Sequence, residues 1–141
     1  MDNKIINKIV MDTNVIVSAF ISPNGNPAKI LTMFTKSQVQ AFYNAEILKE
    51  YETVIKRPHF KFSEEKIRKF FQDIEILGFY CQPQKSTIPL PDETDRCFYD
   101  VAKTCNAWLI TGNGKHYPKE SFVIAPTEFL ILQQPANSTI I

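Results

Sequence analysis

Four acidic residues stand where a carboxylate could do chemistry. Asp12 directly follows the apolar run Ile9-Val10-Met11, which is typical of a buried strand, and an unpaired carboxylate is expensive to desolvate there. Glu50 lies beside the apolar stripe of an expected helix. Asp92 and Asp95 flank the start of another expected helix, where backbone N–H groups favour an anion. If these segments converge, the carboxylates repel one another unless a divalent cation such as Mg²⁺ or Mn²⁺ neutralises them.

Each acid also has a simpler interpretation when it is taken alone. Asp12 could cap the helix that follows it, and Glu50 could be a solvated helix residue. Asp92 and Asp95 could be turn and N-cap residues. Only the joint order of the four acids along the chain favours a shared site.

The elements that must position these acids alternate between strands and helices. We expect strands at 9–11, 38–43, 79–82, 108–110 and 122–125. We expect helices at 14–20, 28–36, 45–56 (capped by Asn44), 64–77 (between Ser63 and Gly78), 94–104 and 127–133. This alternation predicts an α/β fold, a three-layer α/β/α sandwich with a mostly parallel central sheet.

Ligands of such folds bind beyond the carboxyl ends of the strands, at a topological switch point. Two expected strands end on polar tripeptides, Asp12-Thr13-Asn14 and Thr111-Gly112-Asn113. The pattern therefore directs attention to this edge of the sheet.

Composition limits the classes of protein that the chain can belong to. Its 141 residues carry 16 Lys and Arg against 15 Asp and Glu, a net charge of +1, and the length predicts one domain over residues 1–141. Because the chain is not a polycation, nucleic acid would have to bind through a local patch or a metal ion.

Three cysteines without a CxxC pair indicate reduced intracellular thiols rather than a disulfide framework or zinc site. We find no signal peptide and no run of about 18 apolar residues, so we expect a cytoplasmic protein without a membrane segment.

The ordered motifs resemble a known family. The string IVMDTNVIVSAFISPNGNPAKIL resembles the opening of PIN domains, small metal-dependent nucleases, and more narrowly the VapC-like toxins of toxin–antitoxin pairs. The resemblance continues through AEILKEYETVIKRPHF, PDETDRCFYDVAKTCNAWLITGN, KHYP and VIAPTEFL, and so covers residues 8–132. It implies hydrolysis of RNA phosphodiester bonds with Mg²⁺ or Mn²⁺, a small antitoxin protein as partner, and a homodimer.

The resemblance also assigns roles to particular residues. The implied metal ligands are Asp12, Glu50, Asp92, Asp95 and Asn113. Of these, Asp12, Glu50 and Asp95 are expected to be catalytic, and Asp92 is accessory. Asn113 stands where the family usually has a fourth Asp, and its amide oxygen can orient a water but brings no charge.

Neighbouring polar and basic residues complete the expected site. Thr13, Asn14 and Thr111 are expected to orient the carboxylates or contact a phosphate. Basic residues cluster around Pro58 (Lys56, Arg57, His59, Lys61) and after the Thr-Gly-Asn tripeptide (Lys115, His116, Lys119). Among them we expect Arg57, Lys115 and His116 to bind the substrate.

An acid after the first strand is also found in other classes of protein. A haloacid-dehalogenase-like phosphatase needs a second Asp two residues after the first, and that residue here is Asn14. A dinucleotide-binding module needs GxGxxG after the first strand, and none of the four glycines is suitably placed. A catalytically weakened PIN domain, acting as a nucleic-acid-binding or regulatory module, stays open because of Asn113.

Overall fold

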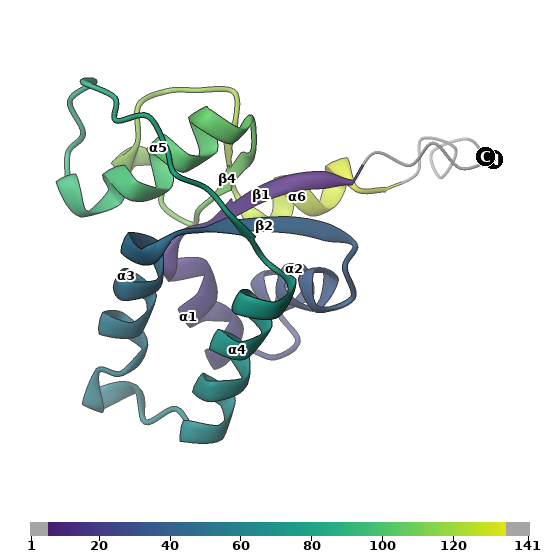
Figure 1. Cartoon of the computed structure of the whole chain (residues 1–141). Coiled ribbons are helices and arrows are strands. Elements are labelled where there is room, and N and C mark those ends of the chain that lie inside the picture. The colour runs from purple at the N-terminus through teal and green to yellow at the C-terminus, as the bar shows by residue number, and fades with distance from the viewer. Residues whose placement is uncertain (1–5, 135–141) are drawn as a thin grey trace, which may run out of the picture.

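The computed structural model describes residues 6–134, and its centre is a parallel five-stranded sheet in the order β3-β2-β1-β4-β5 (Figure 1). The strands are β1 (Asn7–Met11), β2 (Val39–Tyr43), β3 (Phe79–Tyr80), β4 (Trp108–Ile110) and β5 (Val123–Ile124). Every neighbouring pair of strands is parallel. The predicted parallel sheet is confirmed.

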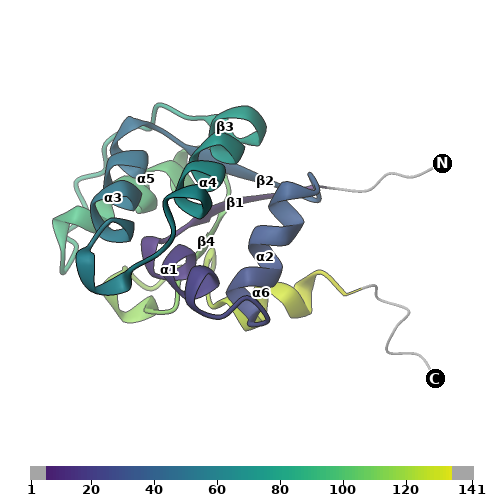
Figure 2. The same cartoon turned by 90° about the horizontal axis from the view of Figure 1, so that it is seen from below.

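Helices cover both faces of this sheet. They are α1 (Thr13–Ile21), α2 (Asn26–Thr35), α3 (Ala45–Ile55), α4 (Glu64–Leu77), α5 (Arg96–Cys105) and α6 (Pro126–Leu132). Figure 1 shows α5 on one side of strands β1 and β2, with α1, α2 and α4 on the other. The view from below places α1, α2 and α4 in front of the sheet (Figure 2). This arrangement confirms the three-layer α/β/α sandwich.

Side-chain caps start two of the helices where the sequence predicts them. The Asn44 side chain accepts a hydrogen bond from the Ile47 N–H at 2.9 Å and starts α3. Ser63 accepts one from the Lys66 N–H at 3.1 Å and starts α4. Each bond satisfies a backbone donor that has no partner inside the helix. Three short 3₁₀ turns were not predicted: η1 (Pro58–Phe60), η2 (Glu93–Asp95) and η3 (Gly114–His116).

The core explains why the central strands read as continuous apolar runs. Ile9, Val10, Leu109 and Ile110 have no exposed surface, because helices cover both faces of a parallel sheet. No helix within residues 6–134 has the length and apolar character needed to cross a membrane.

The strand order places the switch point between β1 and β4. From β1 the chain first adds β2 and β3 on one side, and then returns through α5 to add β4 and β5 on the other. Met11 pairs with Ile110, so Asp12 and Thr111 leave the sheet at the same level. The two polar tripeptides therefore meet at the edge where α/β folds bind ligands.

Candidate metal centre

Asp12 is buried, and within residues 6–134 its hydrogen bonds reach only one of its two carboxylate oxygens. Its side chain is 5% exposed, and its Oδ2 accepts hydrogen bonds from Thr111 Oγ1 at 2.8 Å and Tyr117 OH at 2.9 Å. Asn14 Nδ2 donates a longer bond of 3.4 Å to the same oxygen. Asp12 occupies the N-cap position of α1, but its side chain makes no capping hydrogen bond. Among the described residues no donor bonds Oδ1, and this oxygen is available to a cation.

Asn14 links the two tripeptides. Its Oδ1 accepts a hydrogen bond from the Gly112 N–H at 3.0 Å, while its Nδ2 lies 3.4 Å from Thr111 Oγ1. Thr111 Oγ1 also accepts from the Asn113 N–H at 3.0 Å. Because Asn14 and Thr111 both contact Asp12, the ends of β1 and β4 form one hydrogen-bonded unit.

Asp95 carries the clearest electrostatic signature of the site. Burial, followed by the negative charges of Asp12, Asp92 and Glu50, raises the pKa of Asp95 to about 6. Its Oδ2 is buried without a hydrogen-bond partner in the described part of the chain. The His116 ring opposes the shift, since its Nδ1 lies 3.6 Å from that oxygen. A carboxylate in this setting gains from a cation.

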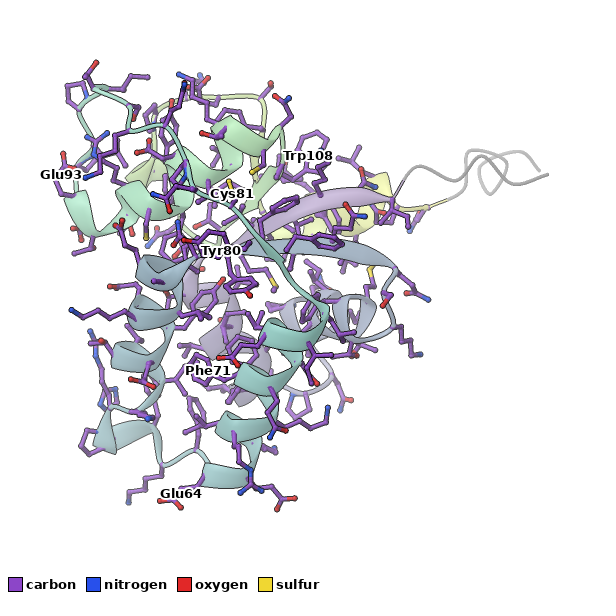
Figure 3. The ribbon with its side chains drawn as sticks, viewed as in Figure 1. Glu64, Phe71, Tyr80, Cys81, Glu93 and Trp108 are labelled. Carbon is purple, nitrogen blue, oxygen red and sulfur yellow. The ribbon has the colours of Figure 1, made fainter. Side chains whose placement is uncertain are left out.

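Asp92, unlike Asp95, accepts hydrogen bonds from a neighbouring residue. Its Oδ1 accepts hydrogen bonds from the Thr94 N–H at 2.9 Å and the Thr94 hydroxyl at 2.8 Å. These bonds hold its pKa below the ordinary value and start the turn before α5. Figure 3 labels Glu93, the next residue in this turn. Asp92 is exposed, so its local role is that of a cap.

Glu50 faces the same region from α3. It is half-buried, and its charge raises the pKa of Asp95. Burial, followed by the charges of Glu46 and Glu50, raises the pKa of the Cys97 thiol to about 12. Glu50 therefore points toward the start of α5 and is not simply a solvated helix residue.

Two tyrosines take polar roles that the sequence analysis missed. Tyr117 is buried and bonds Asp12, and burial followed by the charges of Asp12 and Asp95 raises its pKa. Tyr51 is buried, and its hydroxyl donates to the Met11 carbonyl at 2.5 Å. Tyr117 lies in the KHYP segment, shortly after the Thr-Gly-Asn tripeptide. This position in the sequence could have indicated that Tyr117 lies near Asp12.

The remaining expected residues separate into near and distant sets. Thr13 is buried, and its Oγ1 has no hydrogen-bond partner within residues 6–134. Asn113 and Lys115 are exposed beside His116, which approaches Asp95. Arg57 instead lines a cleft of about 860 Å³ between α3 and α4, whose lining includes the labelled Glu64 and Phe71 in Figure 3.

The donor set fits a hard cation in chemical type. Asp95 Oδ2 is buried and accepts no hydrogen bond within residues 6–134, and the charges of Asp12 and Glu50 both act on this carboxyl group. Mg²⁺ and Mn²⁺ prefer such ligands. Across residues 6–134, however, no three acidic, histidine or cysteine side chains are close enough together to enclose a metal ion. The carboxylates thus form an open arrangement, and Asp95 is the member whose pKa is raised.

Comparison with known proteins assigns the chain to a protein family. A family model described as "PIN domain" matches residues 8–115, a stretch that contains Asp12, Glu50, Asp95 and the Thr-Gly-Asn tripeptide. The chain is also 33% identical over 113 residues to "Uncharacterized protein MJ1680" of Methanocaldococcus jannaschii, covering 78% of this chain and 73% of that protein. No solved structure gives a significant match. With the matched segment spanning the whole switch point and its carboxylates, the chain belongs to the PIN domain family.

Proposed function

We propose that this protein is a divalent-metal-dependent endoribonuclease that hydrolyses RNA phosphodiester bonds. PIN domains are in general metal-dependent nucleases. The observation that carries the proposal is Asp95 Oδ2, which is buried and accepts no hydrogen bond within residues 6–134. Burial and the charges of Asp12, Asp92 and Glu50 raise the pKa of this carboxyl group. Such a cluster is unfavourable by itself and favourable around a cation.

The proposed ligands are Asp12 through Oδ1, Asp95 through Oδ2, and Glu50 either directly or through water. Asp92 and the Asn113 amide would take outer positions. When bound, a Mg²⁺ or Mn²⁺ ion supplies Lewis acidity and makes a water molecule acidic enough to act as the nucleophile.

The chain's own residues set the geometry and charge for this reaction. Thr111, Tyr117 and Asn14 all bind Asp12 Oδ2, and so they fix the direction of the free Oδ1. With a pKa of about 6, Asp95 is ionised at neutral pH and can serve as a ligand. We assign Thr13 an orienting role at the same centre, since its Oγ1 is buried and lacks a hydrogen-bond partner within residues 6–134.

Substrate contacts would come from the basic residues nearby. We assign Lys115 and His116 to the phosphate next to the scissile bond, because His116 already lies beside Asp95. Arg57 would contact RNA farther away, at the cleft between α3 and α4. Contacts of this kind go to the backbone and carry no sequence information.

Within the same proposal, the protein is the toxin of a cytoplasmic toxin–antitoxin pair, acts as a homodimer, and is held inactive by a small antitoxin protein. The resemblance to VapC-like toxins supports this assignment. The exposed Asn113 supports the second candidate, a catalytically weakened PIN domain that binds RNA without cutting it.

The deciding experiment measures cleavage of total RNA by the wild-type chain and by Asp12→Asn, each with Mg²⁺, with Mn²⁺ and with EDTA. We expect wild-type cleavage with either cation, none in EDTA, and a loss of about 100-fold or more in the variant, because the cation loses a charged ligand. Asp73→Asn is the matched control, since Asp73 lies on α4 and pairs with Lys69 at 2.9 Å. It should cleave at the wild-type rate.

Thermal unfolding of both variants accompanies the assay. Asp12→Asn should remain folded, so that its loss of cleavage reports on chemistry. Wild-type cleavage by Asp12→Asn would show that the assigned role is wrong. A wild-type protein that binds RNA but cuts none with either cation would favour the weakened module instead.

A further inference from the structure

We propose that the rings of His59, Phe60 and Phe62 form an aromatic ladder that stacks against the unpaired bases of single-stranded RNA. Two basic neighbours, Arg57 and Lys61, bind the phosphates of the same strand. The inference deepens the proposed function and takes its substrate, RNA, from it, because base stacking does not read the 2′-hydroxyl that distinguishes RNA from DNA.

The three rings stand side by side in the turn that joins α3 to α4. The ring centroids of His59 and Phe60 are 4.2 Å apart, and the two planes make an angle of 38°. Those of Phe60 and Phe62 are 5.1 Å apart, and these planes are within 5° of parallel. Phe60 belongs to both pairs, so it is the middle ring of the ladder.

The backbone at Lys61 brings the last two rings together. Lys61 has a φ of 53° and a ψ of 35°, a left-handed conformation that is uncommon for residues other than glycine and asparagine. In an extended strand the Cα atoms on either side of Lys61 would be about 6.6 Å apart. The left-handed turn lets the rings of Phe60 and Phe62 approach more closely than that and stack.

One end of the ladder is anchored in the core and the other end is open. Phe62 meets the ring of Phe20 edge-on at 5.1 Å, and Phe20 meets Phe70 at 5.7 Å. Phe70 is buried, Phe60 and Phe62 are half-buried, and His59 is exposed. A base can therefore extend the ladder at His59 against rings that are already ordered, which lowers the entropic cost of binding.

The charges around the ladder suit a phosphate backbone. Arg57 and Lys61 are exposed, and neither forms a salt bridge within residues 6–134. Both line the cleft of about 860 Å³ between α3 and α4, together with Phe62, and basic side chains outnumber acidic ones in that lining by five to three. One of the three acids, Glu52, is paired with Lys56 at 3.3 Å.

Exposed rings beside unpaired cations favour a nucleic acid over an acidic protein as the occupant. An acidic peptide would be attracted by the charges alone. A single strand of RNA uses both features, since its bases stack on aromatic side chains while its phosphates follow the basic groups.

The ladder lies outside the proposed metal centre but is continuous with it through α3. Glu50 is five residues before Ile55, the last residue of α3, which is about 8 Å along the helix axis. The ladder follows this end of the helix. Figure 1 shows α3 running away from the sheet to the turn before α4, and Figure 3 labels Glu64 at the start of α4. The ladder would therefore hold nucleotides away from the scissile bond.

The test measures binding of a fluorescein-labelled oligouridine of roughly 12 nucleotides to the full-length protein in EDTA, where no cation supports cleavage. Two further probes have the same length. An abasic oligoribonucleotide keeps the phosphates without the bases, and a duplex of oligouridine with oligoadenine keeps its bases paired. We expect the wild type to bind oligouridine about fivefold or more tightly than the abasic probe.

The variant His59→Ala removes the open end of the ladder. It should bind oligouridine about fivefold or more weakly than the wild type, and should bind the abasic probe and the duplex unchanged. Because His59 is exposed, the melting temperature should stay within roughly 2 °C. His59→Tyr should restore the binding of oligouridine, since it supplies a ring without the imidazole.

The variant Arg57→Gln separates the phosphate contacts from the stacking. It should weaken the binding of all three probes, and for oligouridine it should reduce the slope of log affinity against log salt concentration by about 0.7. Lys29→Gln is the matched control, because Lys29 is an exposed cation on α2. Its affinity for each probe should equal that of the wild type.

Equal affinities of the wild type and His59→Ala for oligouridine would overturn the proposal and leave the ladder to packing or to a protein partner. An equal loss on the abasic probe would also overturn it, because His59 would then act on the phosphates. Neither measurement depends on cleavage. If the wild type cuts no RNA while His59→Ala still loses oligouridine alone, the nuclease proposal fails and the stacking platform stands.

Discussion

At the Asp12 carboxylate, two hydroxyls and one amide converge on a single oxygen. Thr111, Tyr117 and Asn14 reach Oδ2 from three different parts of the chain. Such donors offset the desolvation of a buried charge without neutralising it. The carboxylate is therefore held in one direction, which is the condition for holding a cation in one place.

The Tyr117 hydroxyl should matter for stability as well as for cleavage. We expect Tyr117→Phe to lower the free energy of unfolding by about 1–2 kcal/mol, because a buried hydrogen bond to a charged group is lost. Urea unfolding measures this loss. Tyr80→Phe is the control, since Tyr80 is 60% exposed and bonds only Gln82, and its change should stay within about 0.5 kcal/mol. Equal changes in the two variants would contradict the assigned role of Tyr117.

Asp95 predicts a pH dependence of stability with a definite sign. Its folded-state pKa is about 6, above the ordinary value of 3.8, so between these values the folded state binds more protons than the unfolded state. Stability from this group is therefore present at low pH and lost as the pH rises through about 6. In EDTA, Asp95→Asn should be more stable than the wild type at pH 7, by roughly 1 kcal/mol after solvent screening. At pH 4 this advantage should disappear.

Adding Mg²⁺ supplies the control for that experiment. A bound cation favours the ionised carboxylate, so Mg²⁺ should stabilise the wild type at pH 7 and leave Asp95→Asn nearly unchanged. Unfolding curves recorded at both pH values, with and without the cation, give the comparison. A variant that is less stable than the wild type at pH 7 in EDTA would rule out the repulsion inferred at Asp95.

At the scale of the elements, the end of α4 shows how one small residue sets a helix boundary. The sequence predicts a stop at Gly78, and α4 ends at Leu77. Gly78 has an ordinary φ of −79°, so a left-handed conformation is not the reason. A Cβ at this position would lie 2.4 Å from the Ile74 carbonyl oxygen and 3.0 Å from Tyr43 Cδ1. The close approach of α4 to β2 requires glycine.

This packing makes Gly78→Ala destabilising. We expect a loss of about 1–3 kcal/mol, because backbone and a core-facing ring must move to admit the methyl group. The matched control is Gly114→Ala, where a Cβ would meet nothing within 4 Å. That variant should be neutral or slightly stabilising in thermal unfolding. A neutral Gly78→Ala would show that α4 and β2 separate easily.

For the molecule as a whole, apolar surface remains at one edge of the sheet. Ile76 is 77% exposed, Phe79 45% and Tyr80 60%, and β3 is the terminal strand beside β2. An unpaired edge with exposed aromatic side chains is a surface that proteins commonly cover.

We accordingly expect a homodimer in solution, with a two-fold axis and the same patch contributed by each copy. Multi-angle light scattering at micromolar concentration should give twice the 16.2 kDa of one chain. A monomeric mass at that concentration would contradict the expectation. Dilution toward nanomolar concentration should lower the mass if the interface is of moderate strength.

Local patterns in the sequence determined most of the fold and the proposed location of the site. Three kinds of local feature depend only on residues that are close together in the sequence: apolar runs such as Ile9-Val10-Met11, helix caps such as Asn44, and the helix end at Gly78. They can therefore be recognised without knowledge of the tertiary structure. The order of strands and helices then determined the parallel sheet. The position of Asp12 directly after the first strand is likewise evident from the sequence alone.

Only the tertiary structure decided how these acids differ from one another. Asp92 and Asp95 look alike in sequence, yet Asp92 is satisfied by Thr94 while Asp95 is buried next to other carboxylates. Tyr117 reaches Asp12 across 105 positions in the sequence, and no local pattern records such a pairing. Burial and charge repulsion depend on which segments pack together, and packing brings together residues that are far apart in the chain.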